Sequence, residues 1–204
     1  MLTEHSEEAE LVEAAVNRVR MHRMDPWGLH GLAHWWRVRH NGLLIADVMN
    51  ANRRVLLLFA IFHDSHRMDD EFDPDHGPRA AAWLSKLRRN RRDEDASRDD
   101  STVAAAIRAL ADPEFQSLHD ACAFHTHEPF HDDPTVAACF VADRLDLSRA
   151  GFRPDPARMP GPSNLLTDAF IDEAIARQRA GLDWNGGRGI ERTWKVRPAR
   201  WSSP

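Results

Sequence analysis

Several features that identify common kinds of site are scarce in this sequence. Only two of its 204 residues are cysteines, Cys122 and Cys139, and they form no CxxC pair. We therefore expect neither a disulfide framework nor a thiolate zinc site. Basic residues are not in excess either, because 27 Lys and Arg stand against 32 Asp and Glu, for a net charge of −5. This balance argues against a broad nucleic-acid-binding face.

Long apolar runs, internal repeats and glycine-rich phosphate loops are absent as well. The longest apolar run, Val55 to Phe62, is far too short to span a bilayer. The first residues, MLTEHSEEAELVEA, are acidic where a secretory signal would be basic and then apolar. We therefore expect a cytoplasmic protein without a membrane partner. A chain of this length is expected to bury one core and to form one domain.

The apolar residues that are present recur with a helical period, and hairpin signals are missing, which predicts an all-α fold. The predicted helices cover residues 4–24, 29–50, 53–67, 76–89, 101–111, 114–127, 134–149 and 165–179. Asp100 or Ser101 would cap the fifth helix. Residues 1–150 would form the helical core. Residues 151–204 would add a proline-rich connection, the last helix and an irregular C-terminal arm packed on the same domain.

One stretch is rich in arginine. Residues 88–100 read RRNRRDEDASRDD and have no apolar face, which predicts a solvated connection. Nucleic-acid contact through residues 88–92 is the weaker interpretation, because the acidic residues that follow offset the arginines.

Histidine is abundant, with 12 copies, and one of them ends the apolar run. His63 continues the predicted buried face of Leu56 and Phe59, and Asp64 follows directly. An ionised carboxylate in a core costs much free energy unless it is paired, hydrogen-bonded or bound to a metal. A hydrogen-bonded Asp–His pair at a helix end is the other interpretation, and the doublet alone does not decide between them.

Two further predicted helices direct polar side chains inward. His34 lies on the stripe of Val38 and Ile45, although alone it would more often be a core histidine than a ligand. Asp143 shares a face with Phe140. Four side chains could therefore meet at one point: His34, His63, Asp64 and Asp143. Two imidazoles and two carboxylates suit manganese, iron, cobalt, nickel or zinc better than magnesium.

The order of these residues, His34, then His63–Asp64, then Asp143, resembles the HD-domain metal-dependent phosphohydrolase superfamily over residues 28–150. The stretches HGLAHWWRV, LFAIFHDSHR, DPDHGPRAAAW, ACAFHT and DPTVAACFVADRLDLSRAGF are similar to those of a small bacterial HD-domain group. The resemblance implies a single helical bundle whose central helices carry a metal. It also implies hydrolysis of a small phosphate ester, a nucleotide or a related phosphomonoester, by metal-activated water.

Some superfamily members bind a second metal through extra histidines, so one or two ions are expected. His76 and His125 lie in the right order for that role, with Asp64 as the bridge. A helix-capping His76 and a hydrogen-bonded core His125 are the alternatives. His30 remains a reserve ligand. Residues His127 and His131 are predicted to lie in a loop.

The resemblance also suggests catalytic roles. Asp64 or Asp143 would orient the attacking water. Where several nucleotide-cleaving members place a glutamate, this chain has Arg67, which cannot act as a base but could bind phosphate bidentately. His66 could protonate a leaving oxygen, or be an exposed histidine near a helix end.

Arg37 and Arg144 stand next to predicted ligand positions along their helices. They could contact the substrate or form surface salt bridges.

Two rival functions remain open at this point. An HD-fold di-iron oxygenase would use His34, His63, Asp64, His76, His125 and Asp143. A non-catalytic helical binding module would keep the metal only as a structural staple.

Overall fold

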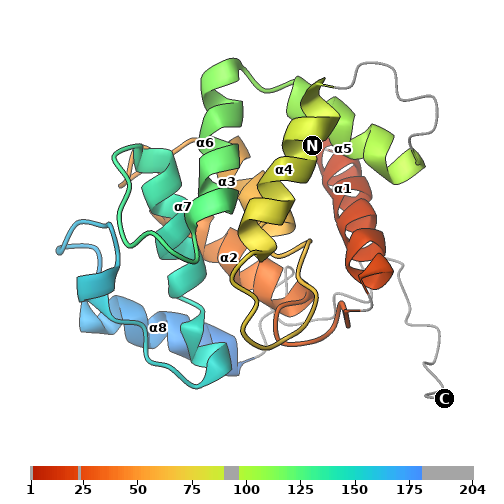
Figure 1. Cartoon of the computed structure of the whole chain (residues 1–204). Coiled ribbons are helices and arrows are strands. Elements are labelled where there is room, and N and C mark those ends of the chain that lie inside the picture. The colour runs from red at the N-terminus through yellow and green to blue at the C-terminus, as the bar shows by residue number, and fades with distance from the viewer. Residues whose placement is uncertain (1, 23, 90–96, 181–204) are drawn as a thin grey trace, which may run out of the picture.

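The computed structural model describes residues 2–22, 24–89 and 97–180, and these residues form helices and no strand (Figure 1). The α-helices are α1 (Leu2–Met21), α2 (Leu32–Ile45), α3 (Arg53–Phe62), α4 (His76–Arg89), α5 (Arg98–Arg108), α6 (Asp112–Phe124), α7 (Pro134–Arg144) and α8 (Asp168–Arg179). Two 3-10 helices, η1 (Leu147–Ala150) and η2 (Pro156–Arg158), connect α7 to α8. The predicted all-α class is confirmed. The predicted connection at residues 90–96 and the arm at 181–204 lie outside the described residues.

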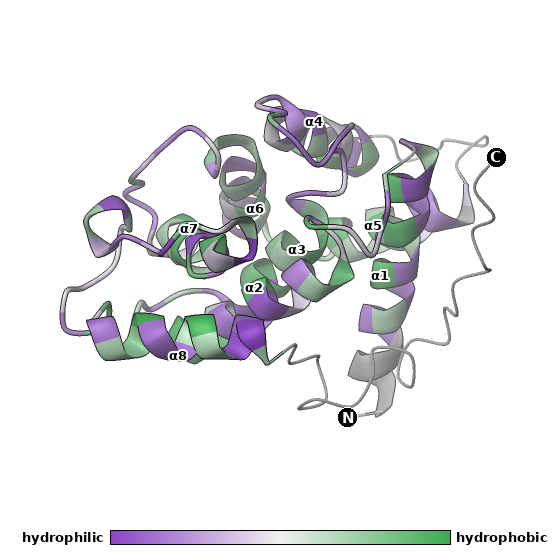
Figure 2. Ribbon diagram, turned by 90° about the horizontal axis from the view of Figure 1, so that it is seen from below, coloured by the Kyte–Doolittle hydropathy of each residue, from purple (hydrophilic) through white to green (hydrophobic). Residues whose placement is uncertain are grey.

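The helices enclose α3, which packs against α1, α2, α6 and α7. Seven of the eight residues of its apolar run, all except the partly buried Leu57, have buried side chains. α1 and α5 lie at one side of the bundle and α8 at the other (Figure 1). The helices turn many of their hydrophobic residues, green in Figure 2, toward its middle. Each fully buried Phe or Leu side chain contributes roughly 1.5–3 kcal/mol to stability, so this core dominates the folding free energy.

Several predicted helix ends are wrong, and local turn hydrogen bonds account for the most important one. α3 ends at Phe62 instead of residue 67, because the chain tightens into turns after His63. The amide of Ser65 donates to the Phe62 carbonyl at 3.1 Å, and the amide of Arg67 donates to the Asp64 carbonyl at 3.2 Å. His63 is therefore the C-cap of α3, and Asp64 lies in the following turn, not on the helix.

Two other boundaries also differ from the prediction. α5 begins at Arg98, and its cap is Ser97, whose hydroxyl accepts from the amide of Asp100 at 3.1 Å. Neither Asp100 nor Ser101 is the cap. α7 ends at Arg144, and the segment predicted to continue it to residue 149 forms η1.

Three helices begin together at one corner of the bundle, which we call the Asn52 corner (Asn52, Glu114 and Thr135). The Asn52 side chain caps α3 by accepting from the amides of Arg54 and Val55. Its Nδ2 donates to Glu114 Oε1 at 2.7 Å near the start of α6, and its amide donates to Thr135 Oγ1 at 3.1 Å at the start of α7. α3, α6 and α7 have similar lengths of 10, 13 and 11 residues. Because they begin at the same corner, their C-terminal ends also lie at the same end of the bundle.

Among the described helices, none is both long and apolar enough to cross a membrane.

Candidate metal centre

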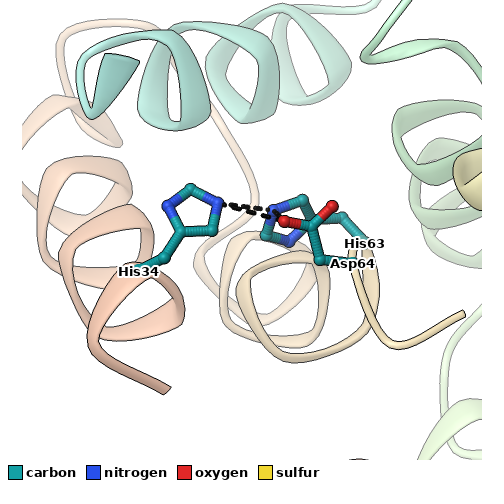
Figure 3. Close-up of side chains that lie close together, drawn as sticks. All are labelled: His34, His63 and Asp64. Atoms are coloured by element: carbon teal, nitrogen blue, oxygen red, sulfur yellow. Dashed lines mark hydrogen bonds and ion pairs between the residues drawn. The ribbon is translucent and has the colours of Figure 1, made fainter. Parts of the chain in front are cut away.

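The C-terminal ends of α3 and α7 and the first turn of α2 bring the four predicted ligands together. His34 and His63 face one another with their Nε2 atoms 3.0 Å apart. Asp64 Oδ2 lies 3.4 Å from each of these nitrogens (Figure 3). Asp143 Oδ1 lies 3.3 Å from His34 Nε2 and 4.0 Å from His63 Nε2. Both imidazoles are fully buried. We call these four residues the first ligand group.

Hydrogen bonds behind the two imidazoles determine which nitrogen carries the proton in the neutral ring. His34 Nδ1 lies 2.7 Å from Asp146 Oδ2, and His63 Nδ1 lies 3.0 Å from the Phe59 carbonyl. Both partners are acceptors, so each Nδ1 donates and each neutral Nε2 presents a lone pair. Asp64 Oδ2 and Asp143 Oδ1 are buried and have no hydrogen-bond partner among the described residues. Four acceptors thus point at one another, and a shared cation is what makes such an arrangement favourable.

The pKa of His34 reflects the same excess of negative charge. Burial and the nearby Arg149 lower this pKa, but contacts with three carboxylates outweigh them and raise it to about 9. These carboxylates belong to Asp143, Asp146 and Asp64. Without another cation, the group therefore draws a proton onto His34.

Asp146 is a functional residue that the sequence pattern did not single out. It is 1% exposed and holds the His34 ring in place through the Nδ1 contact. Arg37 donates hydrogen bonds to both carboxylate oxygens of Asp146, from Nε to Oδ1 at 2.6 Å and from Nη2 to Oδ2 at 3.0 Å. The predicted substrate contact by Arg37 is therefore replaced by an ion pair behind the ligands. A carboxylate behind a ligating histidine is common in metal sites, and the spacing of Asp146, three residues after Asp143, was the available signal.

A second ligand group lies on the other side of Asp64 and contains Asp64, His76 and His125. Asp64 Oδ1 lies 3.0 Å from His76 Nε2 and 4.0 Å from His125 Nε2, and the two nitrogens are 2.9 Å apart. His125 Nδ1 donates to the Cys122 carbonyl at 2.8 Å, which leaves a lone pair on Nε2. His76 Nδ1 contacts both the Asp73 carbonyl and Arg67 Nη1, an acceptor and a donor, so its neighbours permit either tautomer.

Gly77 allows the second group to form. His76 is the first residue of α4, and His125 is the C-cap of α6. A Cβ atom at position 77 would lie 2.3 Å from the Cys122 carbonyl oxygen and 3.0 Å from His125 Cε1. Only glycine lets the start of α4 approach the end of α6 this closely.

Helix dipoles favour a cation at this place. His63 and Asp64 follow α3, His125 follows α6, and Asp143 lies in the last turn of α7. The C-terminal end of a helix carries partial negative charge, and three such ends converge here. The buried His and Asp side chains could therefore hold a metal ion, and Asp64 presents one oxygen to each ligand group.

A cavity of about 540 Å³ opens beside the two groups and reaches Asp64, Asp143, His76 and His125. Its wall also carries four arginines, Arg67, Arg144, Arg149 and Arg158. Arg67 thus lines the same cavity as Asp64, and its role in phosphate binding stays a prediction. Its Nη1 lies 4.0 Å from Asp64 Oδ1, and its Nη2 donates to the Glu71 carbonyl at 3.0 Å.

Arg144 lines the cavity, but its guanidinium is hydrogen-bonded to the backbone of the segments around it. Its guanidinium donates to the carbonyls of Pro129 at 2.7 Å, Arg158 at 3.0 Å and His125 at 3.2 Å, and also to that of Glu128. These hydrogen bonds hold backbone segments together, and contact between Arg144 and a substrate stays a prediction.

His66 differs from both interpretations made from the sequence. It is buried, so it is no exposed histidine, and it is not among the residues that line the cavity. Its ring packs 4.8 Å from that of Trp83, and its Nδ1 lies 3.0 Å from Ser65 Oγ. Burial, together with Arg18, lowers the pKa of His66 to about 3. A neutral ring outside the cavity does not fit the predicted role of general acid.

The remaining histidines lie at the edge of the site. His30 lines the cavity but belongs to neither ligand group, and its Nδ1 lies 3.1 Å from Asp70 Oδ1. His127 and His131 lie outside the helices, as predicted.

Comparison with known proteins adds no relative to this description. No protein-family model, no curated protein and no solved structure matches the chain.

Proposed function

We propose that the protein is a metal-dependent hydrolase that acts on a small phosphate ester, a nucleotide or a related phosphomonoester. One observation carries the proposal. Asp64, which is 3% exposed, presents its two oxygens to two separate sets of imidazole nitrogens, and its Oδ2 has no hydrogen-bond partner among the described residues. The resemblance of the ordered ligand set to the HD-domain superfamily supports the same function.

A divalent manganese, iron, cobalt, nickel or zinc ion bound there would lower the pKa of a coordinated water and polarise a phosphoryl oxygen. The chain's own residues supply the remaining requirements. His34 and His63 are oriented by Asp146 and by the Phe59 carbonyl. Since Arg67 replaces the glutamate of several nucleotide-cleaving superfamily members, Asp64 or Asp143 would orient the attacking water.

Arg67 would balance the charge that develops on the phosphoryl oxygens. Its Nη2 donates to the carbonyl of Glu71, so the guanidinium enters the reaction already oriented. A covalent route through cysteine is unfavourable, because Cys122 and Cys139 do not line the cavity and burial raises the pKa of both thiols.

The test is a panel of nucleotides and aryl phosphates assayed with manganese, cobalt, nickel and magnesium. Asp64→Ala should abolish phosphate release with every metal. Arg67→Ala should lower kcat/KM, because it removes stabilisation of the transition state. Asp132→Ala, which removes an exposed carboxylate from a loop, is the matched control and should keep wild-type activity. Release that survives Asp64→Ala would point to a contaminating phosphatase.

A second candidate, a di-iron oxygenase, is favoured by the convergence of six side chains, Asp64 and five neighbours. These are the predicted ligands of that alternative: His34, His63, Asp64, His76, His125 and Asp143. Two bound irons, oxygen uptake and no phosphate release from any ester would decide for it. A bound metal that raises stability without either activity would instead decide for the non-catalytic module.

A further inference from the structure

Arg149 is a cation of the cavity wall to which the sequence pattern assigned no role. It lies on η1, and its side chain is 8% exposed. Its Nη1 donates to the Asp146 carbonyl at 3.1 Å, which holds the guanidinium from behind. Its Nη2 lies 3.8 Å from Asp143 Oδ1, too far for a hydrogen bond. Neither Nη2 nor the buried Nε has a hydrogen-bond partner among the described residues.

The other arginines of the cavity wall differ from Arg149 in their partners. Arg144 donates to four backbone carbonyls. Arg67 is partly committed, because its Nη1 lies against His76 and its Nη2 donates to the Glu71 carbonyl, whereas its buried Nε, like that of Arg149, has no partner among the described residues. The side chain of Arg158 is 85% exposed at the rim. Buried donors in proteins normally have partners, so the open donors of Arg149 indicate a ligand that accepts from them.

The position of Arg149 indicates what that ligand approaches. Asp143 Oδ1 lies 3.3 Å from His34 Nε2 on one side and 3.8 Å from Arg149 Nη2 on the other. A molecule that reaches the first ligand group from the cavity therefore comes within range of Arg149. Arg67 stands beside the other carboxylate, with Nη1 4.0 Å from Asp64 Oδ1. The two guanidiniums thus flank the two ligand carboxylates.

We infer that Arg149, together with Arg67, forms an anion site that binds the terminal phosphate of a phosphomonoester. Guanidinium groups present planar pairs of donors that match the oxygens of a phosphate. Two fixed cations beside a divalent ion favour a doubly charged terminal phosphate over a singly charged diester, which has one fewer free oxygen. The assignment of the ester rests on the proposed function, whereas binding of the anion requires no hydrolysis.

The experiment measures the binding of inorganic phosphate to the manganese-loaded full chain by calorimetry. Arg149→Met should weaken phosphate binding by about tenfold or more, the loss expected for a hydrogen bond to a charged group. The phosphate affinity of Arg149→Lys should lie between those of the wild type and Arg149→Met, because lysine keeps the charge but lacks the planar pair of donors. Arg53→Met, which removes an exposed arginine at the opposite end of α3, is the control and should match the wild type. Manganese content should be the same in all four proteins.

Three results would overturn the anion site. The first is that the wild-type protein binds no phosphate. The second is that the wild type and Arg149→Met bind phosphate with equal affinity. The third is that Arg149→Met loses manganese, which would make Arg149 a support for the metal ligands. A parallel assay compares kcat/KM for a monoester and a diester, and Arg149→Met should lower the value for the monoester more.

The two proposals can fail separately. Phosphate binding that depends on Arg149, without hydrolysis of any ester, would retain the anion site and reject the hydrolase. Ester hydrolysis that Arg149→Met leaves unchanged would retain the hydrolase and reject the anion site.

Discussion

The two ends of the unit formed by α3, α6 and α7 use polar groups in opposite ways. At the Asn52 corner, the carboxylate of Glu114 accepts from Asn52 Nδ2 at 2.7 Å and from the Ala111 amide at 2.8 Å. The hydroxyl of Thr135 accepts from the Asn52 amide. At the ligand end, Asp64 Oδ2 and Asp143 Oδ1 are buried without a hydrogen-bond partner among the described residues.

This difference separates groups that stabilise the fold from groups that are ready for a ligand. A buried acceptor without a partner costs about 1–3 kcal/mol, so these two oxygens require either a metal ion or the proton that His34 draws in its absence. At the Asn52 corner, the chain itself supplies hydrogen-bond donors to the carboxylate. At the ligand end, it leaves two carboxylate oxygens without a hydrogen-bond partner among the described residues. Substitutions at the corner should therefore change stability alone, and substitutions at the ligand end should change metal binding.

The largest effect is expected at Asp64, because it faces both ligand groups. Asp64→Ala should leave no bound metal and should abolish the rise in Tm that metal causes in the wild type. His63→Ala should do the same for the first group. Metal analysis after dialysis and thermal unfolding with and without manganese are the measurements. A wild-type metal content in Asp64→Ala would contradict the assignment of the centre.

A smaller effect is expected at Asp146, which orients a ligand without belonging to the ligand group. Asp146→Asn keeps an oxygen near His34 Nδ1 but removes the charge and the ion pair with Arg37. The affinity for metal should fall roughly 10–100-fold, as is typical for such supporting groups. Competition with a chelator measures it. Asp155→Asn, at an exposed carboxylate beside η2, is the control and should keep wild-type affinity.

The two ligand groups can be separated at His125. His125→Ala should keep the metal of the first group and remove only a second metal, so the wild type and the variant should differ by at most one ion per chain. Metal stoichiometry in both proteins is the readout. If His125→Ala and His63→Ala lose metal to the same extent, the division into two groups is wrong.

The inward direction of His34, His63 and Asp143 could be predicted because each one continues an apolar helical stripe. His34 follows the face of Val38 and Ile45, and Asp143 follows the face of Phe140, so inward direction was readable from local spacing. The interpretation of these residues as catalytic stays a prediction.

The supporting residues could not be predicted, because their roles depend on how distant segments meet. Asp146 supports His34 only because α2 crosses the segment after α7. The burial of His66 likewise depends on a distant segment, because its ring packs against that of Trp83 on α4.

The smallest effect is expected at the Asn52 corner, and it should depend on pH. The amide of Ala111, and then the side chain of Asn52, lower the pKa of Glu114 from its usual value. A carboxylate whose pKa is lower in the folded protein contributes stability above its unfolded pKa, and that contribution disappears as the pH falls through the folded pKa. Glu114→Gln keeps the shape and loses one acceptor. Its free energy of unfolding at pH 7 should therefore be about 1 kcal/mol lower than that of the wild type.

The difference between Glu114→Gln and the wild type should shrink as the pH falls below the usual range of a glutamate, because the wild-type carboxyl then also loses an acceptor. Urea unfolding at several pH values measures it, and Glu173→Gln on the exposed side of α8 is the control. Metal content should stay at the wild-type level throughout, since the substitution lies at the far end of the three helices. A loss of metal in Glu114→Gln would show that the two ends are coupled and would break the contrast between them.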